Sequence, residues 1–388
     1  MRRHTYKVLF LLPTFTFGGA ERTSLNLLRG MDKDRFRICL VTSKTMSGYF
    51  QNIDIEKIIA IENLGLDVWF NSAKRFMHDV RKIALVLKEE KPDISFGMMH
   101  YPSSLLVFAK KFFHMETNII VSPRGPSTEY LKHFEHKLLR KALLRWIFGS
   151  FCRYADGVVV ASSGMKNECV REYRAKPERV EVIPNSIDVN DIKTKIEEEA
   201  DIDIPAGFKL IVTLGRLEKE KNITVLLKVF SEVRKKEKIK LLIIGDGSEK
   251  TAIERLVLEL NIREDVILVG HQNNPYKYIM RADIFVHTCL FEGFANVIIE
   301  AMACGVPVVA VDCPYGPRDI IRNRENGILV QMNDEGALAD AIMTLLHNRQ
   351  LRDLIAKRGF ERAMDFTANK MVESYERFFQ RILDKRIN

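Results

Sequence analysis

The feature that most constrains the fold is a regular alternation of short apolar runs with longer helical segments along all 388 residues. Runs rich in Val, Ile and Leu predict strands in both halves, at residues 7–12, 37–42, 93–96, 118–121, 157–161 and 180–183, and again at 209–214, 240–244, 266–269, 284–287, 308–311 and 328–330. Continuous apolar strands separated by helices indicate a parallel sheet that helices cover on both faces. The sequence therefore predicts an α/β protein with two doubly wound, Rossmann-like domains.

The change from one half to the other falls near residues 183–208, where a turn-rich segment leads into an acidic stretch. A chain of this length is too long for one ordinary core and suits two domains of nearly equal size. We expect the boundary after residue 188. Ligands of parallel sheets gather at the carboxyl ends of the strands, so we expect the site in a cleft between the two domains.

The N-terminus and the cysteines bear on the compartment. The segment MRRHTYKVLFLLPTFTFGG imitates a signal peptide, but Pro13 interrupts its apolar run, so we interpret it as a first strand. The six cysteines show neither a CxxC pair nor a metal-ligand spacing, which favours reduced thiols in a cytosolic protein. No apolar run approaches the roughly 20 residues that a membrane span needs.

The net charge of +9 is unevenly distributed. The first 188 residues carry about 30 Lys and Arg against about 20 Asp and Glu, whereas the remainder is balanced. In residues 129–154 the cations Lys132, Lys137, Arg140, Lys141 and Arg145 interleave with leucines and aromatic residues. This pattern suits either a helix on an anionic membrane surface or a helix that packs on the core with a solvated basic face. Nucleic acid is a weaker interpretation, because the segment has no known binding motif.

Two glycines mark the end of the first strand. In LPTFTFGGAERTSLNLLRGM, Gly18 and Gly19 permit a tight turn into a helix and leave room for a ligand beside the backbone. The N–H groups at the start of that helix could bind an anion. The G-x-G-x-x-G dinucleotide fingerprint is absent, and a Gly-Gly turn is often structural.

A second candidate motif follows the strand at residues 209–214. Arg216 lies just after the strand and Lys221 lies near the next helix start. A guanidinium and an ammonium at the carboxyl end of a strand suit a clamp on a diphosphate. The alternative is that both side chains are simply solvated.

Two acids eight positions apart, Glu292 and Glu300, flank the start of a predicted helix at residues 296–304. Because like charges repel, carboxylates should not bind phosphates, whereas their acceptor oxygens suit hydroxyl groups. The helix start and the two cations would bind a diphosphate, and the acids would bind hydroxyls on either side of it. The implied ligand is a nucleotide sugar, although Glu300 alone could be an ordinary acid on a helix surface.

These residues carry a family resemblance. The segment FEGFANVIIEAMACGVPVV resembles the E-x7-E signature of family 4 retaining glycosyltransferases, with Glu292 and Glu300 at the signature positions. The segments FGGAER, GRLEKEKN, GDGSE and DCPYGPRDIIRNRENGILV resemble that family in the same order, so the resemblance covers residues 7 to about 379. The resemblance is strongest to the bacterial branch of the family, which builds lipopolysaccharide, capsule and other surface glycans. Ala295 departs from the pattern, because proline is common there, and its loss could loosen the loop or alter sugar choice.

The resemblance implies a GT-B fold, in which two Rossmann-like domains face each other across a cleft. An N-terminal acceptor domain at 1–188 would be followed by a donor domain at 189–369, and a final helix at 370–388 would cross back. The implied activity is transfer, with retention, of a hexose or N-acetylhexosamine from a UDP-sugar to a lipid-linked or surface-glycan acceptor. Front-face attack is implied as well. The alternatives are a non-catalytic nucleotide-sugar-binding subunit and a GT-B phosphorylase or epimerase.

The resemblance also implies a role for each matched residue. Arg216 and Lys221 would contact the diphosphate, Glu300 the ribose and Glu292 the hydroxyls of the transferred sugar. The remaining implied contacts are the backbone of Gly293, Phe294, Ala295 and Asn296 at the sugar and phosphates, the amide of Gly19 at a phosphate, and His100 beside the reacting sugar. The segments DVN, DID and DGS give no convincing D-x-D carboxylate pair beside a diphosphate loop, so we expect neither a metal nor a cofactor. We expect the enzyme in the cytoplasm, peripherally bound to the inner face of the membrane.

Overall fold

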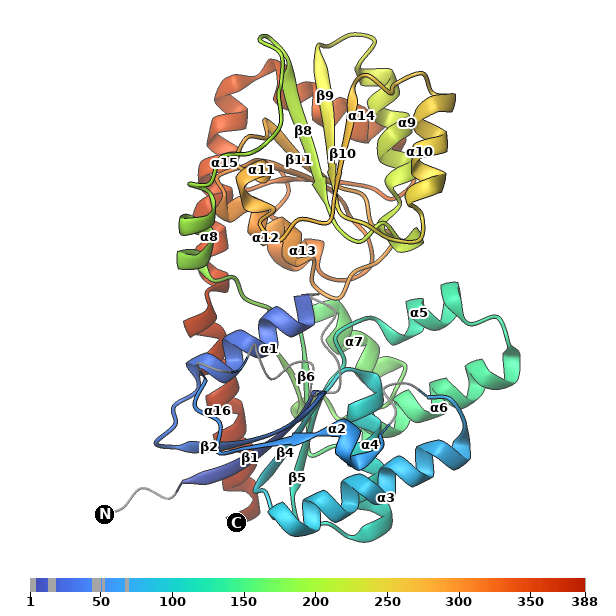
Figure 1. Ribbon diagram of the computed structural model, residues 1–388, viewed down its shortest axis with the longest axis vertical. Coiled ribbons are helices and arrows are strands. Elements are labelled where there is room, and N and C mark those ends of the chain that lie inside the picture. Colours follow the sequence, from blue (N-terminus) through green and yellow to red (C-terminus); the bar gives the residue numbers. More distant parts are fainter. Residues whose placement is uncertain (1–4, 13–18, 44–49, 51–52, 67–69, 388) are drawn as a thin grey trace. The chain divides into compact units, whose positions relative to one another are not determined.

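The computed structural model describes the chain except residues 1–4, 13–18, 44–49, 51–52, 67–69 and 388. The chain divides into two compact units, shown in Figure 1. Unit 1 comprises Met1–Ser186 and Ala368–Asn388, and unit 2 comprises Ile187–Thr367. The boundaries that we expected after residues 188 and 369 each differ by two residues from these.

Unit 1 is built on a seven-stranded parallel sheet in the order β3-β2-β1-β4-β5-β6-β7. Its strands are β1 (Tyr6–Leu12), β2 (Phe36–Thr42), β3 (Lys57–Ala60), β4 (Ile94–Met98), β5 (Asn118–Ser122), β6 (Gly157–Val160) and β7 (Val180–Val182). The order reverses between β1 and β4, so the carboxyl ends of these neighbouring strands form the switch point of the sheet.

The helices of unit 1 are α1 (Gly19–Gly30), α2 (Ile61–Leu64), α3 (Ala73–Glu90), α4 (His100–Phe113), α5 (Ser127–Phe134), α6 (Leu138–Tyr154), α7 (Ser163–Arg171) and α16 (Ala368–Ile387). Apolar side chains of α1 and α16 pack with those of β1, β2 and β4 in one buried cluster. Helix α4 packs against β4 and β5 and also contacts α3 and α6. Helices therefore cover both faces of the sheet, as continuous apolar strands require.

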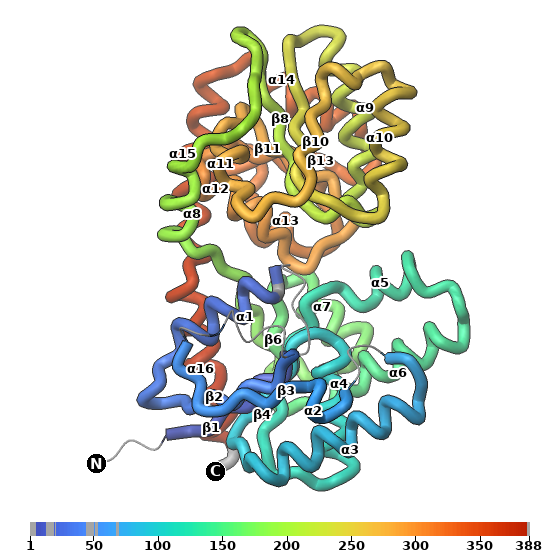
Figure 2. Tube along the Cα trace, viewed as in Figure 1, coloured from blue at the N-terminus to red at the C-terminus, as the bar shows by residue number. Residues whose placement is uncertain are grey.

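The last helix, α16, packs on the N-terminal sheet although it follows unit 2 in sequence (Figure 2). Tyr375 and Phe379 are completely buried, and their rings contact Phe96 of β4 with centroid separations of 5.8 Å. These contacts show that the final helix crosses back to the N-terminal unit, as the resemblance implied.

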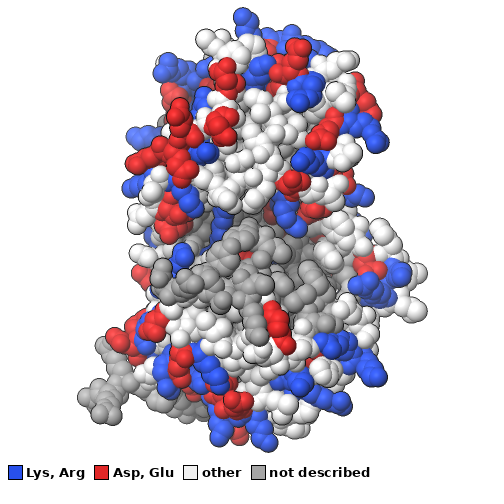
Figure 3. Space-filling view, viewed as in Figure 1, with Lys and Arg blue, Asp and Glu red and all other residues white. Residues whose placement is uncertain are grey.

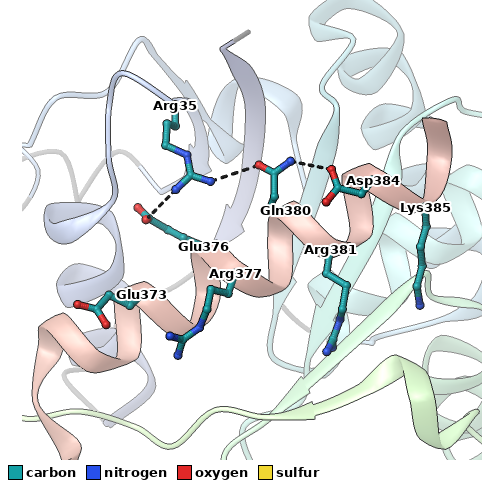
Figure 4. A pocket seen from close by; sticks show the side chains of 8 residues that line it. All are labelled: Arg35, Glu373, Glu376, Arg377, Gln380, Arg381, Asp384 and Lys385. Atoms are coloured by element: carbon teal, nitrogen blue, oxygen red, sulfur yellow. Dashed lines mark hydrogen bonds and ion pairs between the residues drawn. The ribbon is translucent and has the colours of Figure 1, made fainter. Parts of the chain in front are cut away.

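Polar contacts also hold α16 in place. Arg35 pairs with Glu376 at 3.6 Å and donates a hydrogen bond to Gln380 at 3.2 Å (Figure 4). An open groove of about 790 Å³ runs beside these residues and is lined by Arg35, Glu373, Glu376, Arg377, Gln380, Arg381, Asp384 and Lys385. Both acidic and basic side chains line the groove, and it includes none of the predicted site residues.

Unit 2 contains a six-stranded parallel sheet in the order β10-β9-β8-β11-β12-β13. Its strands are β8 (Lys209–Leu214), β9 (Ile239–Ile244), β10 (Val266–Gly270), β11 (Ile284–His287), β12 (Val308–Val311) and β13 (Ile328–Val330). Its helices are α8 (Val189–Lys195), α9 (Ile223–Val233), α10 (Lys250–Glu259), α11 (Tyr276–Ile279), α12 (Asn296–Ala303), α13 (Pro317–Ile320), α14 (Glu335–His347) and α15 (Arg349–Ala363). Residues of α9, α10, α14 and α15 form a single core with the strands.

The predicted strands agree with the structure, except that one strand was missed. The ranges for β8, β11, β12 and β13 are identical to those expected, and the others differ by at most two residues at an end. The missed strand, β3, lies at the edge of its sheet, and its first two residues, Lys57 and Ile58, are exposed. The apolar run that contains β3, residues 58–61, is short and continues directly into α2, so periodicity alone does not distinguish it from the start of a helix.

The basic segment at residues 129–154 forms two helices, α5 and α6, instead of one. The inner side of α6 is buried through Leu144, Ile147 and Phe151, so the helix packs on the core. Leu138 and Leu139 at its start are 82% and 90% exposed. The core-packing interpretation is therefore confirmed for the inner side of α6, and the membrane-surface interpretation stays a prediction. Among the described residues, no helix is both long and apolar enough to cross a membrane.

Candidate active site

Two loops at the carboxyl ends of β8 and β9 are joined by hydrogen bonds. The backbone N–H of Leu217 donates to Asp246 O at 2.9 Å, and Glu249 N–H donates to Leu217 O at 2.8 Å. The Glu218 carboxylate accepts hydrogen bonds from the backbone N–H of Ser248 at 3.2 Å and from its hydroxyl at 2.6 Å. The GRLEKEKN and GDGSE motifs thus form one double loop at the edge where a ligand of this sheet would bind.

Glycines permit this close approach of the two loops. A Cβ on Gly245 would lie 1.8 Å from Gly215 O, and the φ of 142° at Gly245 is one that other residues rarely adopt. A Cβ on Gly247 would lie 2.4 Å from Leu217 O. Any side chain at either position would push the loops apart, which explains why glycine is needed there.

Lys221 and Glu292 form a largely buried ion pair across two further loops. Lys221 ends the 3-10 helix η3 (Lys219–Lys221), and its Nζ lies 2.5 Å from Glu292 Oε1. Burial alone would raise the pKa of Glu292, but the charge of Lys221 and hydrogen bonds from His287 and Lys221 more than offset this and lower that pKa. Burial opposes the charge on Lys221 as well, yet neighbouring groups that include Glu292 raise its pKa. Both groups are therefore charged at neutral pH.

Two more side chains contact the same carboxylate oxygen. His287 Nε2 lies 3.2 Å from Glu292 Oε1, and Cys289 Sγ also lies 3.2 Å from it. Because an ionised carboxylate only accepts hydrogen bonds, Nε2 of His287 must carry the proton that it donates. His287 was not among the residues predicted from the sequence. The signal that could have identified it is a histidine at the end of an apolar strand, five residues before the first signature acid.

Arg216 does not reach this cluster. Its side chain is 70% exposed and pairs with Glu220 at 3.2 Å, four residues along the same loop. The backbone N–H of Leu290 donates to Glu220 O at 2.8 Å, which joins this loop to the one that carries Glu292. Arg216 thus lies on a loop connected to the Lys221–Glu292 pair, but its guanidinium is oriented by Glu220.

The loop before α12 has an unusual backbone. Gly293, Phe294 and Ala295 are buried, and Ala295 has a φ of 73° directly before Asn296 begins the helix. Gly316 packs against this loop, because a Cβ there would lie 2.6 Å from Phe294 O. Proline fixes φ near −65°, so the proline common in related sequences could not adopt the conformation of Ala295. Ala295 thus adopts a left-handed backbone conformation before α12, and whether the loss of proline loosens the loop or alters sugar choice stays a prediction.

Glu300 is 4% exposed within α12, so the alternative that it is an ordinary surface acid is wrong. Burial, followed by the charge of Glu300, raises the pKa of the nearby Cys304 thiol to about 12. The helix places Glu292 before its start and Glu300 inside it, as the eight-residue spacing indicated. Whether Glu300 binds a ribose stays a prediction.

Three predicted residues, Gly18, Gly19 and His100, belong to unit 1. Helix α1 begins at Gly19, which is consistent with the expected turn into a helix, whereas Gly18 lies outside the described residues. His100 is the first residue of α4, and its Nε2 lies 2.6 Å from Ser127 Oγ of α5. Its ring packs against that of Phe148 of α6, with centroids 4.5 Å apart and ring planes tilted by 45°. Burial lowers the pKa of His100 to about 4, so the imidazole is neutral at physiological pH.

The cluster around Glu292 also bears on metal binding. One ligand atom each from His287, Cys289 and Glu292 lie within 4.8 Å of one another. This donor set could suit zinc, but the ammonium of Lys221 already lies 2.5 Å from Glu292 Oε1. A metal ion would have to displace this cation. Our expectation that no metal is needed stays a prediction.

Comparisons with known proteins identify both units. The family described as "Glycosyltransferase Family 4" matches residues 17–191, and the family described as "Glycosyl transferases group 1" matches residues 194–362. An N-acetylgalactosamine-N,N'-diacetylbacillosaminyl-diphospho-undecaprenol 4-alpha-N-acetylgalactosaminyltransferase of Campylobacter jejuni is 32% identical over 279 residues, which are 72% of this chain and 74% of that protein. A second enzyme of that organism, a GalNAc-alpha-(1->4)-GalNAc-alpha-(1->3)-diNAcBac-PP-undecaprenol alpha-1,4-N-acetyl-D-galactosaminyltransferase, is 23% identical and aligns with 95% of this chain and 97% of its own length.

Solved structures show the same fold. Anabaena Alr3699/HepE in complex with UDP matches with a TM-score of 0.76 and 18% identity, covering 96% of this chain and 99% of that one. The apo form of the lipopolysaccharide outer core galactosyltransferase WaaB matches with a TM-score of 0.73 and 22% identity over 96% and 98% of the two chains. At such low identity these structures support the fold alone. Together with the Campylobacter relative, they confirm the resemblance: the chain belongs to the family 4 glycosyltransferases and has the GT-B fold.

Proposed function

We propose that this glycosyltransferase moves a hexose or N-acetylhexosamine from a UDP-sugar to a lipid-linked saccharide, with retention and without a metal ion. The observation that carries the proposal is the Lys221–Glu292 pair, which brings a cation and an acceptor of hydroxyl hydrogen bonds to one point before α12. The names of the two Campylobacter relatives support the acceptor class, because both act on undecaprenol-linked diphosphate saccharides. The Anabaena protein, which has the same fold, was solved in complex with UDP, the nucleotide that we propose for this donor.

The charges of the pair suggest how a donor would bind. A diphosphate carries more negative charge than one carboxylate, so it would draw the Lys221 ammonium toward itself. The Arg216 side chain is exposed, and its loop is hydrogen-bonded to the loop that carries Glu292. Its guanidinium could therefore contact the same diphosphate once its ion pair with Glu220 is broken. Glu292 would then accept a hydrogen bond from a hydroxyl of the sugar, which is the role that the family resemblance implies.

Departure of UDP is the step that these groups would assist. Negative charge grows on the leaving diphosphate in the transition state, and Lys221 together with the N–H groups at the start of α12 would stabilise it. Removing one such contact costs about 2.7–4 kcal/mol of transition-state stabilisation, or roughly 10²–10³ in rate. A fixed ammonium could supply the positive charge that a metal ion provides in other transferases, so no metal need take part.

The acceptor side belongs to unit 1, where we propose that His100 contacts the reacting sugar and Gly19 a donor phosphate. The neutral imidazole of His100 can donate or accept a hydrogen bond at physiological pH, which suits contact with sugar hydroxyls. Its Nε2 is held by Ser127 at 2.6 Å, so the ring has a fixed orientation. Helix α1 begins at Gly19, where its first backbone N–H groups could bind an anion.

A lipid-linked acceptor would require the enzyme to reach a membrane surface, and we propose that the start of α6 makes this contact. Leu138, Leu139 and Trp146 are 82%, 90% and 58% exposed. Lys137 and Lys141 have no ion-pair partner within the described parts of the chain, so they could contact anionic headgroups. Elsewhere on the face drawn in Figure 3, acidic and basic side chains are interspersed.

The basic charge of this surface is smaller than the sequence suggested. Lys132, Arg140 and Arg145 pair with Glu129, Glu135 and Glu172, respectively. The attraction to an anionic bilayer would therefore come from few charges, and insertion of the exposed leucines would supply much of the binding energy.

The direct test is a turnover assay with a panel of UDP-sugars and synthetic lipid-linked saccharides. The proposal predicts that UDP is released only when both a suitable donor and an acceptor are present. Release of UDP without transfer to any acceptor would argue against a glycosyltransferase of this specificity. A glycoside product with inverted anomeric configuration would contradict retention.

A further inference from the structure

The contacts of Glu292 are concentrated on one of its two oxygens. Lys221, His287 and Cys289 all contact Oε1, at 2.5, 3.2 and 3.2 Å. Within the part of the chain that the structure describes, Oε2 has no hydrogen-bond donor. The carboxylate is therefore fixed through one oxygen, and the other remains available to a ligand.

His287 is an unexpected side chain at this position. It ends β11 after three apolar residues and is 3% exposed, so an apolar side chain of similar size would suit the site sterically. Its Nδ1 is buried without a hydrogen-bond partner among the described residues. Burying an unpaired ring nitrogen is unfavourable, so the contact that the other nitrogen makes with Glu292 has to compensate for it.

The ammonium of Lys221 cannot pair fully with Glu292 and with a bound diphosphate at the same time. In the absence of a donor, its ammonium pairs with Glu292 Oε1. If the ammonium turns toward a diphosphate, the mostly buried carboxylate loses its nearest cation, and its orientation then depends on the remaining donors. His287 comes from the end of a strand in the middle of the sheet, so its backbone position does not change when a loop moves.

We propose that His287 is a positioning residue, which holds Oε1 of Glu292 through Nε2–H so that Oε2 can bind a hydroxyl of the transferred sugar while Lys221 binds the diphosphate. This inference rests on the proposed function of the Lys221–Glu292 site. It separates two tasks within the donor site. Lys221 acts on the nucleotide diphosphate, and His287 acts on the sugar through Glu292.

The two tasks can be measured separately with two variants of His287. His287→Leu removes the donor and keeps a buried side chain, whereas His287→Gln can still place an N–H near Oε1. We expect both variants to bind UDP within twofold of the wild-type Kd, measured by calorimetry. We expect kcat/KM for the UDP-sugar to fall about 10–100-fold in His287→Leu, because a Glu292 carboxylate that is no longer held in place orients the sugar less well. In His287→Gln we expect kcat/KM to recover to within roughly threefold of the wild-type value.

A matched control exists in the same unit. His347 Nε2 lies 2.7 Å from Glu237 Oε1, but this pair is on the surface, with the His347 side chain 59% exposed. His347→Leu should leave both UDP binding and kcat/KM unchanged. The double variant His287→Leu/Glu292→Gln should lose little more than Glu292→Gln alone, because His287 acts through Glu292.

Several outcomes would overturn the inference. Equal losses of UDP affinity and of kcat/KM in His287→Leu would mean that the histidine supports the whole loop. Normal turnover in His287→Leu, or turnover as poor in His287→Gln as in His287→Leu, would exclude a role for the Nε2–H donor. A wild-type protein that binds UDP but turns over no UDP-sugar would overturn the proposed function, and this inference with it.

Discussion

The ammonium of Lys221 and the carboxylate of Glu292 meet at 2.5 Å although 71 positions separate them in the sequence. The first residue lies at the end of η3, after β8, and the second lies in the loop after β11, the neighbouring strand of the sheet. Because parallel strands end at the same edge of a sheet, two loops that are distant in sequence can form one charged pair there.

Removing one member of this pair should cost stability, because the other charge is then buried alone. We expect Lys221→Met to lower the free energy of unfolding by roughly 3 kcal/mol, and Lys221→Met/Glu292→Met to recover most of that loss. Chemical denaturation at pH 7 measures both. A double variant that is as unstable as the single variant would show that the two charges do not depend on each other.

The same pair predicts a dependence on pH. The pKa of Glu292 is lowered by folding, so the unfolded state binds more protons in acid, and this contribution to stability is lost as the pH falls below the ordinary glutamate range near 4.3. We expect the stability difference between the wild type and the double variant to shift in favour of the double variant on acidification from pH 6 to pH 3. An unchanged difference over that range would contradict the lowered pKa.

His100 predicts a second dependence on pH, in a higher window. Burial lowers its pKa to about 4 from the ordinary value of 6.5, so between these values the unfolded state takes up a proton that the folded state excludes. Stability should therefore fall as the pH drops from 6.5 to 4. His100→Gln, which can still bond to Ser127, should reduce this slope in urea unfolding experiments. An identical slope in the variant would show that His100 titrates normally.

Ala295 offers a test of the backbone before α12. Its φ of 73° is accessible to glycine but not to proline. We expect Ala295→Gly to change the free energy of unfolding by no more than about 1 kcal/mol, and Ala295→Pro to lower it by roughly 2 kcal/mol or more. Thermal unfolding compares the two. A proline variant as stable as the wild type would show that the left-handed conformation is not required.

The exposed start of α6 predicts binding to membranes. We expect the wild type to float with liposomes that contain anionic lipid, and Leu138→Ser/Leu139→Ser to lose most of this binding without loss of stability, because both side chains are exposed. Leu258→Ser removes a leucine that is 62% exposed in α10 and serves as the control. No flotation of the wild type at low salt, where electrostatic attraction is strongest, would exclude this surface.

Most of the architecture could be predicted from the sequence, because buried parallel strands are continuous apolar runs. Residues 308–311, for example, are all buried and all apolar, and the predicted range was identical to β12. The edge strand β3 was missed because its pairing with β2 depends on the sheet and not on its own pattern. The break between α5 and α6 was missed because neither glycine nor proline marks it.

The acids and the lysine of the candidate site could be located from the sequence, but their partners could not. The close approach of Gly245 to Gly215 joins residues 30 positions apart, and only the packed loops reveal it. His287 followed an apolar run and resembled an ordinary strand end, so nothing in its neighbourhood indicated a contact with Glu292. Arg216 was expected beside Lys221, but local pairing with Glu220 decides its orientation in the absence of a ligand.

The most direct test of the account is acceptor-dependent release of UDP by the wild type and by Lys221→Ala, assayed with a lipid-linked saccharide and a UDP-sugar. We predict that the wild type releases UDP and forms a glycoside, and that a folded Lys221→Ala variant does so about 10²–10³-fold more slowly. Folding of the variant is checked by circular dichroism. Turnover near the wild-type rate in a folded Lys221→Ala variant would contradict the central claim that this lysine stabilises the departing diphosphate.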